Sequence, residues 1–571
     1  MKTILISNDK NNRNYKNLKK IIIGEWCYND YSKEKDPEIY KYLVKDIKLR
    51  KKCIKENLVI EKKILKKIIP TLNGYHQENK STRQWQVILG HWLKSYISVF
   101  SNRYKHINYI LNKEKIDNFI MIKSSNKLFA RDIKDFLNNA RTAQFNDEIY
   151  KNIIKYKKSK TFIKSKIINQ KRKKSEDEKS SIKSKILKFI NLFLSKNDKI
   201  FISELYLNKF EEVLFHLNFN NMPRFWNFHK FYGYSKPNEK LRSKIGNKLL
   251  STKKNNLENF LIKNLFLYMP LAYLEDYKKI KNFCYKVYPK DPKTIITANT
   301  FYYNEAIKNY ISQHINNSKY IVIQHGNNYG THFDEHYKSV EEVTSDYFIT
   351  WGFLKKNKKY LKGVMQKKMI KKKNNKDNLL IMHLPFELRD KVWDNFEDYD
   401  THIKKIEKML RKIKLVNGIK RIIYRIPNGE HNVKGIHYLK KISKKVIFDT
   451  YKTKLLDNIE NSNICLFNYN SSGFYENLSN NIPTILFIDK SYLNEIDPLT
   501  KKDFLKLHKN NVIHFEIEAL YNFLDLNWEN LDNWWLSKKT QEAKNIFVNH
   551  NAISDKNPLK ILTNIIKKIT K

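Results

Sequence analysis

The feature that most constrains the fold is a regular alternation of short apolar runs with amphipathic segments, which begins near residue 290. The runs are rich in β-branched and aromatic residues, which favour strands. They are TIITAN, KYIVIQ and SDYFITWG and, after a lysine-rich link over 366–377, NLLIMHLP, RIIYR, KVIFD, ICLF and TILFI. Strands that alternate with helices predict parallel sheets covered by helices on both faces. We therefore predict an α/β fold with two Rossmann-like domains.

The domain organisation follows from the length of the chain and from this pattern. A chain of 571 residues is too long for one ordinary core. We predict an N-terminal Rossmann-like domain over 1–355, a C-terminal one over 378–535 and closing helices over 536–571. The N-terminal third is mostly helical in pattern, entered through the strand-like run KIIIGEWC, and the charged segment 155–186 is predicted to be a surface insertion.

The chain carries a formal net charge of +52, and lysine supplies most of the excess. A basic chain is a candidate for nucleic-acid binding, because clustered cations release counterions from phosphates. These lysines are instead spread along the whole sequence, so we expect no nucleic-acid partner and a surface that favours anionic ligands and anionic membranes. A basic nucleic-acid-binding protein and a non-catalytic scaffold at the membrane surface stay as alternative functions.

Cysteine usage and hydropathy point to the cytoplasm. The four cysteines lie far apart and form no cluster with histidine, so neither a disulfide framework nor a metal site is predicted. The longest apolar stretch, FLIKNLFLYMPLAYLE, is interrupted by Lys263 and Pro270 and is too short to span a bilayer. We expect a cytoplasmic protein, with peripheral contact at the inner face of the membrane as an alternative.

The first candidate site is the stretch YIVIQHGNNYGTHFDEH, residues 320–336. His325 follows a predicted strand, and ligands of open α/β sheets bind beyond the carboxyl ends of strands. Gly326, Tyr329 and Gly330 would shape the loop there, in a chain that has 13 glycines in all. Histidine titrates near neutral pH, which suits a general base. A turn with an incidental histidine is the alternative.

The second candidate site is FNYNSSGFYENLSNNIPTILF, residues 467–487. Ser471 and Ser472 precede a predicted helix, and serine is a favourable N-cap. The free N–H groups and the dipole of a helix start attract phosphate. Glu476, about one turn into the helix, can accept hydrogen bonds from sugar or ribose hydroxyls, and Thr484 opens the next strand. Ordinary capping of a core helix is the alternative, and no GxGxxG or Walker sequence is present.

Two further candidates stand at the ends of predicted strands. Arg425 ends RIIYR, where a lone arginine can bind phosphate or carboxylate bidentately, with a surface ion pair as the alternative. Glu25 ends the strand-like run in KIIIGEWC and can act as a base or bind acceptor hydroxyls. Both positions therefore become candidate site residues.

Five motifs recur here in an order and spacing that is typical of a known family. They are IIIGEWC, STRQWQVILGHWL, IQHGNNYG, SDYFITWG and SSGFYENLSNNIPTILF. Together they resemble the transferases found in O-antigen and surface-carbohydrate biosynthesis clusters, over nearly the whole chain, from about 20 to 550. The resemblance implies a GT-B-like fold, in which two Rossmann-like domains face a cleft, with a helix-rich N-terminal part. The acceptor would lie on the N-terminal domain and the activated donor mainly on the C-terminal one.

The resemblance also implies roles for the candidate residues. The His-Gly pair is similar to that of CDP-glycerol polymer transferases, in which the histidine is thought to act as base, so His325 would deprotonate the acceptor hydroxyl, with Glu25 as a second catalytic candidate. The donor would be held by Arg425, Ser471, Ser472, Glu476 and Thr484. The chain departs from the family after the strand, where RIPNG replaces the expected Arg-hydrophobic-Tyr-Pro run.

The expected activity is a metal-independent glycosyl transfer that uses a nucleotide sugar as substrate and no further cofactor. The acceptor implied by the resemblance is a glycan or lipid-linked precursor of a surface polysaccharide. A donor activated by CMP and carrying an acidic sugar is one possibility, because the basic surface would suit a charged donor.

Overall fold

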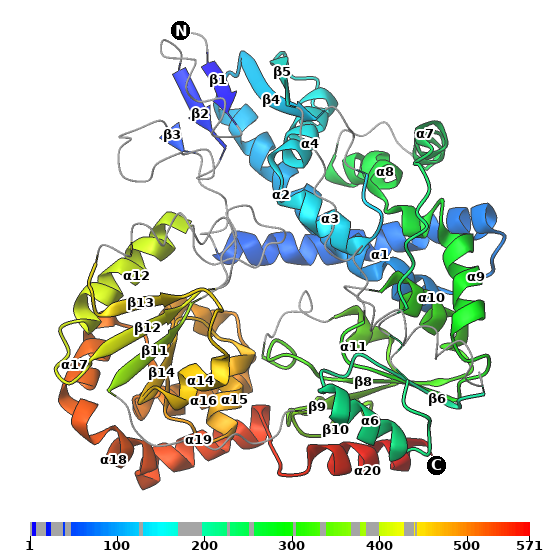
Figure 1. Cartoon of the computed structure of the whole chain (residues 1–571). Coiled ribbons are helices and arrows are strands. Elements are labelled where there is room, and N and C mark those ends of the chain that lie inside the picture. Colours follow the sequence, from blue (N-terminus) through cyan, green and yellow to red (C-terminus); the bar gives the residue numbers. More distant parts are fainter. Residues whose placement is uncertain are drawn as a thin grey trace.

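The structure is a computed structural model, which describes most of the chain with several gaps. The described residues are 3–6, 19–23, 38–39, 47–124, 129–168, 197–224, 226, 229–249, 256–300, 304–331, 339–366, 377–383, 399–426, 439 and 442–570. Within them the chain forms three separate sheets with helices packed around them (Figure 1). All strand pairs found in these sheets are parallel. The predicted α/β class, with Rossmann-like lobes built on parallel sheets, is therefore confirmed.

The C-terminal sheet, drawn mainly in yellow to orange in Figure 1, is doubly wound. Its strand order is β13-β12-β11-β14-β15-β16, so the chain winds one way from β11 and the other way from β14. The sequence predicts all of these strands except the two-residue β16. The elements are β11 (Asn378–Met382), α12 (Tyr399–Ile413), β12 (Arg421–Arg425), β13 (Val446–Asp449), α14 (Leu455–Glu460), β14 (Ile464–Phe467), α15 (Ser472–Ser479), β15 (Thr484–Phe487), the 3-10 helix η8 (Lys490–Asn494), α16 (Pro498–Lys509), β16 (Ile513–His514), α17 (Ile517–Asn527), the 3-10 helix η9 (Trp528–Asn530), α18 (Leu531–Leu536), α19 (Lys538–Asn551) and α20 (Pro558–Thr570).

The middle sheet has the order β10-β9-β8-β7-β6, in which each strand lies beside its neighbour in sequence. The sequence predicts β7, β8 and β9 and misses β6 and β10. The elements are β6 (Ile200–Ser203), α6 (Lys209–Leu217), α7 (Glu239–Lys248), α8 (Leu257–Tyr268), the 3-10 helix η6 (Leu271–Tyr273), α9 (Tyr277–Val287), β7 (Thr294–Thr297), α10 (Glu305–His314), β8 (Lys319–Ile323), α11 (Val340–Thr344), β9 (Tyr347–Thr350) and β10 (Tyr360–Lys362).

The N-terminal sheet was predicted only at β2, which overlaps the strand-like run KIIIGEWC. Its order is β3-β2-β1-β4-β5, so residues 1–355 contain one sheet more than the single Rossmann-like domain expected there. Its first strands are short, and two long helices dominate the sequence pattern around them. The elements are β1 (Thr3–Ile6), β2 (Lys19–Ile22), β3 (Glu38–Ile39), α1 (Ile47–His76), α2 (Thr82–Lys113), β4 (Asn118–Ser124), α3 (Ile133–Ala140), α4 (Ala143–Tyr156) and β5 (Phe162–Ile168).

Part of the segment 155–186, predicted to be a polar surface insertion, is a strand. β5 pairs with β4 in parallel over seven residues, from Phe162 to Ile168. Lys164, Ser165 and Lys166 separate the apolar residues at the two ends of this strand, so its composition hides its pattern. Residues 169–196 lie outside the described residues.

Helix α2 connects the N-terminal and middle sheets through a shared core. It begins after a capping box, in which the Ser81 hydroxyl accepts from Gln84 N at 3.3 Å and the Gln84 side chain accepts from Ser81 N at 2.9 Å. Most of its residues are buried, as expected for a helix covered on all sides. One hydrophobic cluster therefore extends from Leu5 through Trp92 to Val322.

Two segments tie the C-terminal lobe to the rest of the molecule. The two closing helices that the sequence predicts are α19 and α20, and α20 returns to pack Leu562 and Ile566 on the middle sheet. Helix α1 crosses the middle of the molecule (Figure 1), and its first turn reaches the C-terminal lobe. There Arg50 and Glu495, 0% and 2% exposed, form a buried ion pair.

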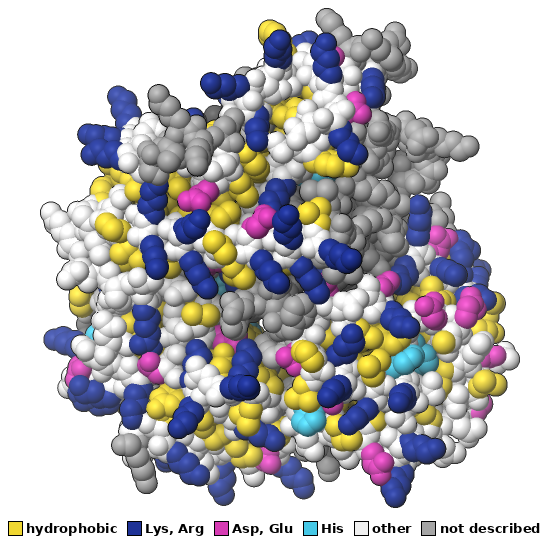
Figure 2. All heavy atoms as spheres, turned by 180° about the vertical axis from the view of Figure 1, so that it is seen from behind, with side chains coloured by type: hydrophobic (Ala, Val, Ile, Leu, Met, Phe, Trp, Pro, Cys, Tyr) yellow, Lys and Arg dark blue, Asp and Glu magenta, His cyan; other side chains and the backbone are white. Residues whose placement is uncertain are grey.

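The charge of the surface is dispersed on the face drawn in Figure 2. Lys and Arg side chains are spread from edge to edge of this face, with Asp, Glu and apolar side chains between them. The basic charge is therefore not gathered into one patch there. Among the helices that the structure describes, none is both long and apolar enough to cross a bilayer.

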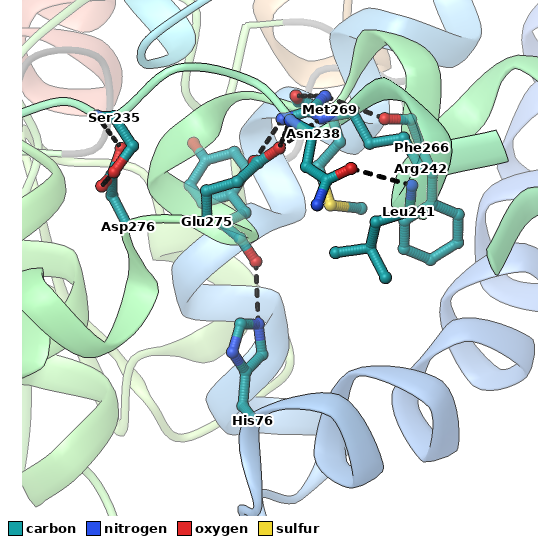
Figure 3. Close-up of polar contacts among 10 residues, drawn as sticks. His76, Ser235, Asn238, Leu241, Arg242, Phe266, Met269, Glu275 and Asp276 are labelled. Atoms are coloured by element: carbon teal, nitrogen blue, oxygen red, sulfur yellow. Dashed lines mark hydrogen bonds and ion pairs between the residues drawn. The ribbon is translucent and has the colours of Figure 1, made fainter. Parts of the chain in front are cut away.

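A buried polar cluster around Arg242 of α7 is structural (Figure 3). The guanidinium donates from Nη1 to the carbonyls of Phe266 and Met269, at 2.9 and 2.6 Å, and from Nε to Glu275 at 2.7 Å. The last carbonyls of a helix have no partner within it, so Arg242 caps the end of α8. These hydrogen bonds give the cluster a structural role, so the cluster is not a candidate site.

Candidate functional site

Helix α15 begins where the winding of the C-terminal sheet reverses, a position at which doubly wound sheets bind ligands. Ser471 is its N-cap, and the Ser471 hydroxyl accepts a hydrogen bond from Phe474 N at 3.4 Å. Gly473 lets the helix start approach β14, because an added Cβ would lie 3.0 Å from the Phe467 ring. The N–H groups of the first turn and the helix dipole favour an anion at this point.

His325 lies just beyond the carboxyl end of β8, in a turn that neighbouring side chains hold in place. Gln324 Nε2 donates to the Gly326 carbonyl at 2.8 Å, and Gln324 Oε1 accepts from Trp351 N at 2.7 Å. The half-buried imidazole stacks on Tyr206, with ring centroids 5.4 Å apart and planes inclined by 4°. These contacts fix the position of the ring relative to the sheet.

The two glycines of this loop have different roles. Gly330 has a φ of +73°, and an added Cβ would lie 2.4 Å from the Phe353 ring, so the loop requires glycine there. An added Cβ at Gly326 would lie 3.7 Å from Ser472 Oγ, which is an ordinary contact. Gly326 therefore marks the point where the loop meets the C-terminal lobe, and Gly330 fixes the backbone conformation.

A series of polar contacts connects His325 to buried groups of the core. The Tyr329 hydroxyl donates to Glu341 Oε1 at 2.7 Å and lies 3.3 Å from His325 Nδ1. The second carboxylate oxygen of Glu341 is 2.6 Å from His91 Nε2. Burial raises the pKa of Glu341, but the two histidines and the tyrosine hydroxyl outweigh this effect and bring the pKa to about 2. Glu341 is therefore an anion at neutral pH.

The surroundings of His325 keep its imidazole neutral at pH 7. Burial lowers the pKa of His325 below its ordinary value of 6.5, while the charge of Glu341 and a hydrogen bond to the Ala298 backbone act in the opposite direction. A neutral imidazole can accept a proton, and the anionic Glu341 stabilises the imidazolium that results. Tyr329, predicted to shape the loop, also bridges these two groups.

The loop that carries His325 contacts the start of α15 directly. Asn327 N donates to Ser472 Oγ at 3.1 Å, and the Ser472 hydroxyl donates to Asn327 Oδ1 at 3.3 Å. One turn further on, Thr331 Oγ1 and the Tyr475 hydroxyl are 3.0 Å apart. The structure thus brings together the two elements that the sequence singled out, one from each lobe. The chemical roles of their side chains stay predictions.

Arg425 is buried and already has an anionic partner. Its Nη1 contacts the Asp449 carboxylate and donates to the Thr453 carbonyl at 2.8 Å. Its guanidinium carbon lies 4.3 Å from the centroid of the Tyr451 ring. The Arg425–Asp449 ion pair fixes the loop between β13 and α14. The sequence left a surface ion pair as the alternative role of Arg425, and the structure shows an ion pair that is buried. Donor binding by Arg425 stays a prediction.

The other predicted site residues differ in their burial and in their contacts. Glu476 is half-buried in the first turns of α15, where its predicted contact with a donor stays open. Thr484 is 0% exposed, donates to the Ile482 carbonyl at 2.9 Å and accepts from Asn477 Nδ2 at 3.1 Å. It begins β15, level with Cys465 of β14, and its predicted contact with the donor stays a prediction. Glu25 lies outside the described residues.

Sequence reasoning missed a group of residues beside His325. Glu204 and Tyr206 follow β6, Asn299 follows β7, and Asn299 Nδ2 contacts the Tyr206 hydroxyl. The run IFIS before Glu204 is β-rich and would have been the signal for this strand. His91 and Glu341 left no sequence signal, because 250 residues separate them.

The described residues offer no evident metal site. Among them, no group of three or more His, Cys, Asp and Glu side chains is placed to hold a metal ion. The described cysteines, Cys53, Cys284 and Cys465, are buried and form no disulfide with one another. Metal-independent chemistry stays a prediction.

Comparison with solved structures gives only distant likenesses. Acinetobacter baumannii MurG is 7% identical over 79% of this chain and 99% of its own, with a TM-score of 0.32. The wall teichoic acid polymerase TagF is 11% identical over 66% and 90%, with a TM-score of 0.31. TarM is 10% identical over 48% of this chain and 54% of its own length, with a TM-score of 0.30. These scores are too low for a conclusion about the site, which rests on the geometry above.

The family of this chain is established by a match to a protein-family model. No curated protein matches the chain. A family model described as LIC12162 family transferase matches residues 3–566, and therefore both lobes and all three sheets. The chain belongs to the LIC12162 family of transferases.

Proposed function

We propose that this transferase moves a sugar from a nucleotide-activated donor to a hydroxyl of a surface-polysaccharide acceptor of the O-antigen type. The observation that carries the proposal is the contact of Asn327 with Ser472, which sets the His325 turn against the start of α15. Glycosyl transfer needs a positioned base and a group that stabilises a departing phosphate. These two requirements match the two elements in contact.

In the proposed reaction the acceptor hydroxyl gives its proton to a His325 nitrogen while its oxygen attacks the anomeric carbon of the donor. The bond between that carbon and the phosphate oxygen breaks, and its electron pair leaves with the nucleotide. The N–H groups at the start of α15 would hold the charge that develops on the phosphate. Glu341 would stabilise the imidazolium through Tyr329.

The donor is proposed to be a nucleotide sugar held mainly by the C-terminal lobe, without a further cofactor. A CMP-activated acidic sugar is one candidate, because a net charge of +52 favours anionic ligands. Ser471 and Ser472 are suited to its phosphate, since they open α15 at the reversal of the sheet. Glu476 is suited to hydroxyl groups of the sugar or ribose.

The proposed location is the cytoplasm, with peripheral contact at the inner face of the membrane, where a lipid-linked acceptor would lie. Helix α1 supports this contact because lysines at helical spacing are exposed along one side of it. They are Lys48, Lys52, Lys55, Lys62 and Lys66. Cations near an anionic bilayer are attracted to it. The dispersed charge in Figure 2 gives no support to nucleic-acid binding.

Nucleotide release from a panel of UDP-, GDP-, CDP- and CMP-sugars, with and without a lipid-linked acceptor fraction, tests the proposal. His325→Asn is expected to keep nucleotide binding and to lose turnover by about 10²–10⁴-fold, the usual contribution of a general base. His314→Asn is the matched control, since His314 ends α10 on the same sheet and is half-buried. Full turnover in His325→Asn would remove this residue from the mechanism, and no turnover with any donor would reject glycosyl transfer.

A further inference from the structure

Strands β6 and β7 end side by side next to His325. They pair in parallel with Ser203 level with Thr297, so Glu204 and Ala298 are the first residues beyond the paired part of each strand. Asn299 N donates to the Glu204 carbonyl at 3.4 Å, which holds the two ends together. This edge of the middle sheet lies directly beside the candidate base, because the Tyr206 ring stacks on His325.

Three polar atoms at this edge are buried without a hydrogen-bond partner. They are Ser203 Oγ, Asn299 Oδ1 and Thr300 Oγ1. Their residues are 1%, 5% and 0% exposed. Buried polar groups in folded proteins are nearly always satisfied, and each one left unpaired is destabilising. Three such atoms, one at the end of β6 and two just beyond the end of β7, indicate groups that a ligand satisfies when it binds.

The backbone at the end of β6 is also held in an unfavourable conformation. Glu204 and Tyr206 have φ values of +54° and +59°, in the left-handed region that non-glycine residues rarely adopt. Residues in such conformations cluster at functional sites, where the surrounding structure maintains them. Tyr206 is 51% exposed, so one side of its ring packs on His325 and the rest remains accessible.

The chemistry of this edge fits an uncharged, hydroxyl-rich molecule. Two side-chain hydroxyls can donate or accept, the Asn299 amide oxygen accepts, and an exposed tyrosine ring beside them provides an apolar platform. The described residues provide no hydrogen bond to the Glu204 carboxyl. Burial raises its pKa to about 7, with the charge of Lys230 acting in the opposite direction and that of Glu212 in the same direction. A carboxyl group in this position disfavours an anionic ligand and can bond sugar hydroxyls in either protonation state.

We propose that Ser203, Asn299 and Thr300 form the subsite that binds an uncharged sugar of the acceptor, with Tyr206 as the platform that leads its reactive hydroxyl to His325. This inference rests on the proposed glycosyl transfer and adds the residues and the charge class of the acceptor. Glu204, the residue after Ser203, would repel acidic sugars from the subsite when its carboxyl is ionised. The donor site at α15 is separate from it and takes no part in the recognition of the acceptor sugar.

Saturation-transfer NMR on the full chain, without donor, tests this subsite. The probes are the methyl glycosides of glucose, galactose, N-acetylglucosamine and rhamnose, with methyl glucuronide as the anionic comparator and UDP and CMP as donor-site probes. The wild type is expected to bind at least one neutral glycoside and not the glucuronide. The double variant Ser203→Ala/Thr300→Val is expected to bind that glycoside at least tenfold more weakly, with nucleotide binding unchanged.

Matched variants separate recognition from packing. Thr297→Val removes a buried hydroxyl that does have a partner, the Tyr320 hydroxyl at 3.3 Å, so it should lower the melting temperature and leave sugar binding intact. Thr300→Val removes an unpaired hydroxyl and should not lower the melting temperature. Glu204→Gln should admit the glucuronide, while Glu342→Gln, which removes a buried carboxylate bonded to the Tyr360 hydroxyl, should not.

The outcomes that overturn the inference are distinct from those that overturn the proposed function. Absence of binding by all four neutral glycosides, or equal binding by the wild type and the Ser203→Ala/Thr300→Val variant, would reject the subsite. Binding of neutral glycosides without any binding of UDP or CMP would support the subsite and count against the proposed donor chemistry at α15.

Discussion

Replacing Glu341 by glutamine removes the charge that supports His325 and keeps the shape of the side chain. A carboxyl whose pKa falls from 4.5 to about 2 on folding contributes about 3 kcal/mol to stability at neutral pH. This contribution is fully present above pH 4.5 and is lost as the pH falls toward 2, because the folded state keeps the carboxylate charged longer than the unfolded state does. We therefore expect Glu341→Gln to lose about 3 kcal/mol at pH 7 and the difference to vanish near pH 2.

The same substitution should change the titration of His325. Because the charge of Glu341 raises the pKa of His325, its removal should lower that pKa further. The assay is ¹³C NMR of histidine-labelled protein, with the His325 signal assigned by its absence in His325→Asn. The acid limb of turnover should move to lower pH in parallel, and turnover at pH 7 should fall roughly tenfold as the imidazolium loses its counter-charge.

The next residue on α11 provides the control. Glu342 is 1% exposed, close to the 0% of Glu341, and accepts from the Tyr360 hydroxyl at 2.8 Å, away from His325. Glu342→Gln should destabilise the protein and leave the titration of His325 unchanged. If Glu341→Gln lowers the melting temperature but does not move the His325 titration, the link through Tyr329 has only a structural role and the reasoning is refuted.

Three further substitutions test individual contacts by thermal unfolding. Gly330→Ala should cost about 2 kcal/mol or more, because its φ is +73° and its Cβ would overlap the Phe353 ring; an unchanged melting temperature would contradict this. Arg50→Met should cost about 3 kcal/mol by removing the buried partner of Glu495, and a neutral effect would mean that α1 does not brace the lobes. Thr484→Val should lower stability by about 1–2 kcal/mol; weaker nucleotide binding would support its predicted donor contact, and unchanged binding would contradict it.

All strands of the C-terminal sheet except β16 could be predicted, most clearly β11, β14 and β15, which are buried on both faces. Runs such as NLLIM and ICLF are continuous in apolar residues, which distinguishes them from the lysine-rich segments between them. Of the N-terminal sheet only β2 was predicted, within the run KIIIGEWC, because β3 has two residues and Lys164, Ser165 and Lys166 interrupt the apolar pattern of β5.

The candidate site was predictable only where its residues follow a strand directly. His325 and Ser471 stand at strand ends that the sequence shows, so their position at the edge of a sheet follows from topology. Thr484 begins a strand, so topology alone does not bring it to the edge where His325 and Ser471 lie, and its donor contact stays a prediction. Glu341 and the unpaired hydroxyl of Ser203 depend on contacts between distant segments, which a single sequence does not reveal.

Hydrogen exchange of the whole chain, followed by mass spectrometry with and without UDP, GDP, CDP or CMP, tests most directly whether the two lobes form one site. We predict that one nucleotide slows exchange at the start of α15, over 470–476, and at the His325 loop, over 324–331, in the same experiment. Protection confined to other segments, or no protection by any of the four nucleotides, would contradict a nucleotide site shared by these two elements.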